Sequence, residues 1–110
     1  MRANLDDLLF KIIYLEKCKL VEEMAGQYKK QMDYEWKIID TIKRIKKNKC
    51  KKLLELLVKE YEKTQDKIEK YTGNVRKQTN LKNALFLERA LQEAIATVEN
   101  SLNTEDCMER

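Results

Sequence analysis

Histidine and proline are absent from this chain of 110 residues, which has two glycines, three cysteines and one tryptophan. The lack of histidine removes the most common general base and the most common metal ligand. No Cys-x-x-Cys pair and no glycine-rich phosphate loop occurs, so neither a zinc site nor a nucleotide site is indicated. We therefore predict no catalytic, cofactor or metal site and expect that the protein is not an enzyme.

Long apolar runs and an export signal are also missing. No apolar stretch approaches the roughly 20 residues that span a bilayer, and the N-terminus lacks a basic-then-apolar leader pattern. The three cysteines, Cys18, Cys50 and Cys107, are odd in number and far apart, which is typical of reduced thiols. We expect a cytoplasmic protein that does not associate with membranes.

The residues that are abundant favour helices. Charged residues make up 38% of the chain and hydrophobic residues 43%, with apolar side chains recurring every three or four positions. This pattern predicts an all-α antiparallel bundle or coiled coil, with a long helix over about 4–47 and shorter helices over about 50–72 and 80–102. Residues 1–103 would form one domain, and 104–110 a frayed acidic tail.

Gly26 lies in the middle of the long predicted helix. The apolar stripe crosses this glycine without a change of phase, and no other turn residue flanks it. A glycine inside a helix costs about 1 kcal/mol relative to alanine, which a long helix tolerates. We therefore favour one helix, straight or bent at Gly26, over the alternative of a break there that would give four helices.

The N-terminal half of that helix is the most apolar part of the chain. If the helix over 50–72 folds back after Asn48, it covers residues 26–47, and the apolar half projects. An exposed apolar face needs a partner, and a homodimer is the simplest one; a sharp bend at Gly26 would instead close a monomeric four-helix bundle. The predicted partner or dimer interface comprises Leu5, Leu8, Leu9, Phe10, Ile12, Ile13, Tyr14, Leu20 and Tyr34.

Aromatic residues divide into two groups by their position relative to the apolar seams. Phe10, Tyr14 and Tyr34 suit a partner surface, because Tyr14 and Tyr34 fall off the seam and aromatic side chains anchor interfaces. The tryptophan and the remaining tyrosines fall on seam positions and are expected in the core: Tyr28, Trp36, Tyr61 and Tyr71.

The positive charge is concentrated in one run. Seven of the ten residues from Lys43 to Lys52 are basic and none is acidic, and residues 43–72 hold 11 basic and 5 acidic groups. A solvated corner beside a helix C-terminus explains much of this run; the alternatives are an acidic protein partner or nucleic acid bound largely without sequence preference. This basic tip comprises Lys43, Arg44, Lys46, Lys47, Lys49, Lys51 and Lys52.

The leading functional hypothesis is a small helical protein-interaction module, such as an adaptor, chaperone-like or inhibitor protein, acting as a homodimer. The alternative is a nucleic-acid-binding protein that uses the basic tip. A third hypothesis is redox chemistry at Cys50, because neighbouring lysines favour its thiolate. Cys50 also begins an apolar seam, so packing is the favoured interpretation of that residue.

Overall fold

The computed structural model describes residues 4–104 and consists of four α-helices. They are α1 (Leu5–Met24), α2 (Tyr28–Lys43), α3 (Lys47–Tyr71) and α4 (Gln78–Asn103), and a short 3-10 turn, η1 (Val75–Lys77), precedes α4. Within this range there is no strand, so the predicted all-α class is confirmed. None of the described helices is long and apolar enough to cross a membrane.

The single helix predicted over about 4–47 is wrong, because the chain breaks at Gly26. Its φ of +72° lies in the left-handed region, which glycine enters without steric cost. The amide of Gly26 donates to the Glu23 carbonyl at 3.1 Å, and the amide of Gln27 donates to the Glu22 carbonyl at 2.9 Å. These two bonds form a Schellman motif, which terminates α1 and satisfies two of its last carbonyls. The alternative of four helices is the one that the structure adopts.

Substitution at Gly26 distinguishes a turn from a continuous helix by the sign of its effect. Gly26→Ala is expected to lower the free energy of unfolding by about 1 kcal/mol, because alanine is strained in the left-handed region. A Cβ at this position meets no atom within 4 Å, so the loss comes from the backbone and not from a clash. In a continuous helix the same change would stabilise the protein by a similar amount. Urea denaturation measures the sign, and Gly26→Asn should lose less because asparagine tolerates this conformation.

The two later helices lie close to their predicted positions. The helix predicted over about 50–72 begins at Lys47 and ends at Tyr71, and the helix predicted over about 80–102 spans Gln78–Asn103. Between α2 and α3 the chain turns through Arg44, Ile45 and Lys46, and the Ile45 side chain is buried. Thr104 caps α4, and the rest of the predicted acidic tail, 105–110, lies outside the described residues.

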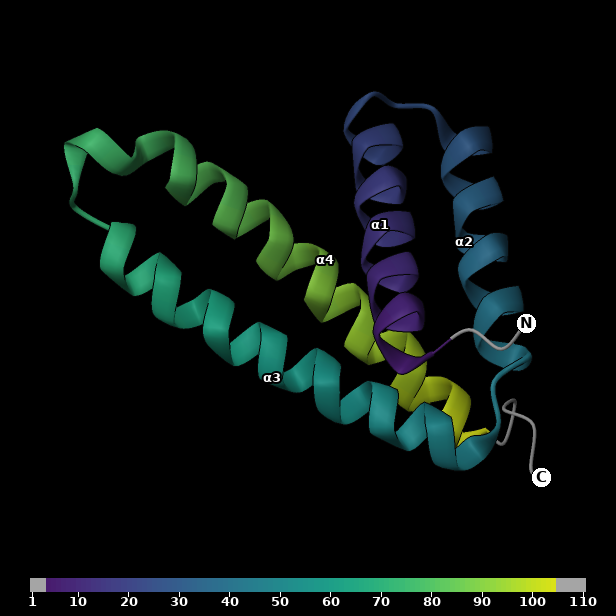
Figure 1. Cartoon of the computed structure of the whole chain (residues 1–110). Coiled ribbons are helices and arrows are strands. Elements are labelled where there is room, and N and C mark those ends of the chain that lie inside the picture. The colour runs from purple at the N-terminus through teal and green to yellow at the C-terminus, as the bar shows by residue number, and fades with distance from the viewer. Residues whose placement is uncertain (1–3, 105–110) are drawn as a thin grey trace.

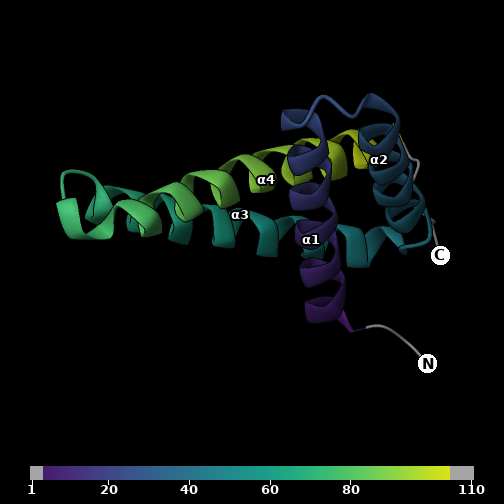
Figure 2. The same cartoon turned by 90° about the horizontal axis from the view of Figure 1, so that it is seen from above.

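The helices form two pairs that cross. α1 and α2 lie side by side, as do α3 and α4, and the α1–α2 pair lies across one end of the α3–α4 pair (Figures 1 and 2). The main core lies at this crossing, where all four helices contribute buried side chains. Its members are Ile12, Leu15, Ile38, Ile42, Ile45, Cys50, Leu53, Leu57, Leu91, Ala94 and Val98.

The part of the molecule that projects differs from the predicted one. Figure 1 shows that the ends of α3 and α4 that flank η1 extend beyond the α1–α2 pair, whereas α1 packs against the other three helices. The expectation of a projecting N-terminal half was wrong because it depended on a continuous first helix. The break at Gly26 folds α2 back alongside α1 and places the inner face of α1 in the core.

Candidate functional site

The predicted interface residues of α1 divide between the core and the surface. Ile12 and Leu20 are fully buried, so they belong to the core and are not available to a partner, contrary to the prediction. A second group packs against the core while remaining half-buried: Leu5, Leu8, Leu9, Ile13 and Tyr34. Phe10 and Tyr14 are exposed, as expected of residues on a partner surface.

A row of apolar side chains runs along the side of α1 that is opposite the core. Phe10, Tyr14, Val21 and Met24 are between 49% and 76% exposed. At about 100° per residue, Phe10, Tyr14 and Val21 project on the side opposite the buried Ile12, and Met24, one turn after the buried Leu20, lies at the edge of that side. We call Phe10, Tyr14, Val21 and Met24 the outer face of α1. Phe10 and Tyr14 belong to the predicted interface, whereas Val21 and Met24 do not.

Tyr14 and Tyr34 contact the same thiol, Cys18. A hydrogen bond with Cys18 is the main cause that raises the pKa of Tyr14, and an electrostatic effect of the nearby Cys18 side chain is the main cause that raises the pKa of Tyr34. Tyr34 belongs to α2, so this contact joins the edge of the outer face to the neighbouring helix. A tyrosine with the ordinary pKa of 10.0 is already neutral at physiological pH, and the raised pKa values keep both phenols neutral, which suits an apolar contact surface.

Two aromatic residues that were expected in the core lie on the surface instead. Tyr28 and Trp36, both in α2, are exposed. Their seam position was assigned by continuing the stripe of α1 through Gly26, and the break at that residue resets the rotation of the second helix. Tyr61, which was assigned within α3, is half-buried and packs against the core.

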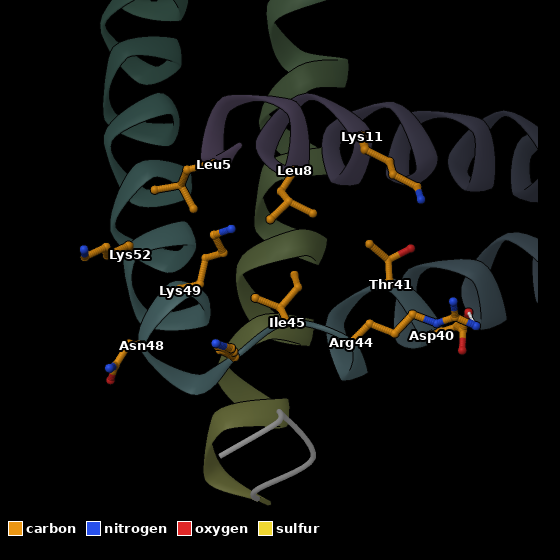
Figure 3. A pocket seen from close by; sticks show the side chains of 11 residues that line it. Leu5, Leu8, Lys11, Asp40, Thr41, Arg44, Ile45, Asn48, Lys49 and Lys52 are labelled. Atoms are coloured by element: carbon orange, nitrogen blue, oxygen red, sulfur yellow. Dashed lines mark ion pairs between the residues drawn. The ribbon is translucent and has the colours of Figure 1, made fainter. Parts of the chain in front are cut away.

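The basic tip lies at the corner between α2 and α3, next to the start of α1. A pocket of about 710 Å³ opens here, and four of the seven predicted residues line it, namely Arg44, Lys46, Lys49 and Lys52. Leu5 and Leu8 of α1 point into the same space from the opposite side (Figure 3). A continuous helix over about 4–47 would have separated Leu5 and Leu8 from the basic tip by nearly its whole length, whereas the break at Gly26 brings them together.

We call this space the basic pocket. Ile45, Thr41 and Asn48 complete its lining, with Lys11 from α1 and Asp40 from α2. Asp40, in the last turn of α2, forms an ion pair at 3.2 Å with Arg44, which caps the C-terminus of that helix (Figure 3). Lys43, Lys47 and Lys51 of the predicted tip do not line the pocket.

A second feature, which the sequence analysis missed, is a cluster of charged side chains inside the protein. Glu16 is fully buried, and its Oε1 lies 2.9 Å from the Nζ of Lys19, which is itself almost fully buried. Lys19 also donates a hydrogen bond to Glu35 of α2 at 2.9 Å and lies 4.0 Å from Glu93 of α4. The single ammonium group of Lys19 therefore lies within ion-pair distance of three carboxylates, which belong to α1, α2 and α4.

The carboxyl group of Glu16 titrates abnormally because of this environment. Burial raises its pKa from 4.5 to about 7, although the ammonium of Lys19 lowers it, and neither oxygen accepts a well-aligned hydrogen bond from a described residue. Burial lowers the pKa of Lys19, but its contacts with Glu35 and Glu16 outweigh burial and leave that pKa raised. Lys19 thus stays protonated while Glu16 titrates near neutral pH.

Within residues 4–104, no group of three or more acidic or thiol side chains is arranged to hold a metal ion. In the charged cluster, the ammonium of Lys19 occupies the centre of its three carboxylates. Cys50 is fully buried in the core, which agrees with the packing interpretation of this thiol.

Comparison of the chain with family models, with curated protein sequences and with solved structures finds no match.

Proposed function

We propose that the protein is a non-enzymatic protein-interaction module that forms a homodimer through the outer face of α1. The observation that supports this proposal is the contiguous exposure of Phe10, Tyr14, Val21 and Met24 on one side of a single helix. Large apolar side chains gathered in this way mark binding surfaces, and aromatic residues contribute much of the binding energy at such surfaces.

The spacing of the outer face suits a second copy of the same helix. Together with Asp7 and Lys17, its residues follow intervals of three and four, which is the seam spacing of a coiled coil: Asp7, Phe10, Tyr14, Lys17, Val21 and Met24. A two-fold axis would pair identical helices through the same patch on each. The occupant of this face is therefore proposed to be α1 of another copy.

An antiparallel pairing places complementary groups together. With Phe10 opposite Val21 of the partner subunit, the register puts Tyr14 opposite Lys17 of the partner subunit. The ammonium of lysine is attracted to the face of a tyrosine ring, and the lysine stem packs against apolar atoms. Because one helix per subunit makes the contact, its area falls at the small end of specific interfaces, and we expect a dissociation constant in the micromolar range.

The homodimer is tested by sedimentation velocity over a series of protein concentrations. The wild-type protein is expected to change from monomer to dimer, whereas Phe10→Ser/Tyr14→Ser should weaken dimerisation by roughly tenfold or more. Val75→Ser is the matched control, because Val75 is 85% exposed and lies on η1, away from α1. Circular dichroism confirms that each variant keeps its helices.

Two results would contradict the homodimer. One is a wild-type protein that remains monomeric at every concentration, since the exposed seam would then lack the proposed occupant. The other is an equal loss of dimer in Val75→Ser and in Phe10→Ser/Tyr14→Ser, since the association would then not depend on the outer face.

A further inference from the structure

The basic pocket combines an aliphatic floor with a cationic rim. Leu5, Leu8 and Ile45 supply apolar side chains from α1 and from the α2–α3 corner (Figure 3). Five basic residues from α1, from the α2–α3 turn and from α3 line the same space: Lys11, Arg44, Lys46, Lys49 and Lys52. A solvated helix end does not require this convergence, because Lys11 is more than 30 positions away from the other four in the sequence.

The balance of charge around the pocket is strongly positive. Asp40 is the one carboxylate in the lining that the structure describes, and it is already paired with Arg44. Lys11, Lys46 and Lys52 line the same space, and no further carboxylate of the described lining is left to pair with them. Like charges that converge repel one another, and an anionic ligand would relieve this repulsion.

From these observations we infer that the basic pocket binds an acidic segment of another protein that carries aliphatic side chains. A volume of about 710 Å³ lies within the range of ligand pockets, and it accommodates two or three aliphatic side chains. The aliphatic side chains of the segment would pack on Leu5, Leu8 and Ile45, and its carboxylates would lie at the lysines. Leu5 and Leu8 are on the inner side of α1, so this site is separate from the outer face and does not depend on the proposed dimer.

The lining favours an acidic protein segment over nucleic acid. Single-stranded nucleic acid is held largely by aromatic stacking, and bases in duplexes are contacted mainly by arginine. Among the described residues that line the pocket there is no aromatic side chain, and the one arginine, Arg44, is paired with Asp40. Its aliphatic floor would gain little from a sugar–phosphate backbone, whereas leucine or isoleucine side chains would fit it.

The probe for this site is a fluorescent peptide of about 12 residues, rich in glutamate, with two leucines four positions apart so that they share one helix face. Anisotropy is measured with the full chain at about 50 mM and about 300 mM salt, because screening weakens exposed ion pairs. We expect binding that weakens with salt, and a loss of roughly tenfold when both leucines of the peptide become glutamine.

Paired charge reversals identify the pocket as the site. Lys46→Glu/Lys52→Glu should weaken peptide binding by roughly tenfold or more, because both lysines line the pocket. Lys43→Glu/Lys51→Glu changes the net charge equally at the same corner but outside the lining, and should weaken it less than about threefold. Circular dichroism and a thermal melt establish that both variants are folded.

Three outcomes would overturn the inference. Equal losses in the two double variants would show attraction to net charge without a site. Undiminished binding of the leucine-free peptide would remove the role of the aliphatic floor. Tighter binding of a single-stranded oligonucleotide of similar charge would show that the ligand is nucleic acid. None of these measurements depends on dimerisation, so a monomeric protein can still support the pocket.

Discussion

Glu16→Gln is expected to make the protein about 3 kcal/mol more stable at pH 8 and to leave its stability near pH 4 almost unchanged. Glu16 is fully buried, and burial raises its pKa from 4.5 to about 7. At about 1.4 kcal/mol for each pKa unit, this rise corresponds to about 3 kcal/mol between the protonated and ionised forms. Glutamine has nearly the shape of the protonated acid and never carries the charge.

The direction of the pH dependence follows from which state holds the proton. Between pH 4.5 and about 7, folded Glu16 retains a proton that the unfolded chain has released. Stability therefore falls as the pH rises through this window, and the contribution of Glu16 levels off above it. The charged groups that face Glu16 are Lys19 on its own helix, Glu35 on α2 and Glu93 on α4. Of these, only Lys19 favours ionisation.

The test is urea denaturation of the wild-type protein and Glu16→Gln at about pH 4, 6 and 8. The difference between the two free energies of unfolding should grow from near zero to about 3 kcal/mol over this range. Glu99→Gln, at an exposed position of α4, controls for the loss of one negative charge. A difference between wild type and Glu16→Gln that stays constant with pH would contradict the assignment.

The helical class followed from composition and spacing, but the path of the chain did not. Apolar residues continue through Gly26 in an unbroken phase, and that phase shows which face is apolar without showing whether the helix is continuous. The decisive information is the conformation of one residue, with φ of +72°. Tyr28 and Trp36 were assigned to the core on that same continuity, and both are exposed.

The charged cluster could have been found in the sequence. Glu16 lies four residues after Ile12 and four before Leu20, so on a helix it shares the face of two core side chains. Lys19 lies four residues after the buried Leu15 in the same way. Their partners Glu35 and Glu93 could not have been predicted, because they come from other helices and meet Lys19 only through the packing of α1, α2 and α4.

The basic pocket is a further case in which the fold supplies what the sequence cannot. Arg44, Lys46, Lys49 and Lys52 were identified as a charged run, and Leu5 and Leu8 as apolar interface residues, but as separate regions. The turn at Gly26 returns α2 alongside α1, so the end of α2 comes beside the start of α1 (Figure 1). The pocket forms because the end of α2 and the start of α1 lie side by side. The spacing of residues along the sequence does not show this proximity.

Lys19→Met is expected to destabilise the protein by about 3–5 kcal/mol at pH 8, which is the usual cost of removing one partner of a buried ion pair. Methionine is similar to lysine in length and fills the same space without a charge. Glu16, Glu35 and Glu93 then lose the ammonium that all three approach. The loss should be smaller near pH 5, because Glu16 takes up a proton there and the buried negative charge disappears.

The coupling between the two buried groups is measured with a double-mutant cycle at about pH 8. Glu16→Gln/Lys19→Met should recover about 2–3 kcal/mol relative to Lys19→Met, because the cavity then contains neither the uncompensated carboxylate nor its counter-charge. Lys19→Arg, which retains the charge, should lose less than Lys19→Met. If the double variant is no more stable than Lys19→Met, Glu16 is not the carboxylate that requires Lys19. The loss in Lys19→Met would then reflect the contacts of Lys19 with Glu35 and Glu93.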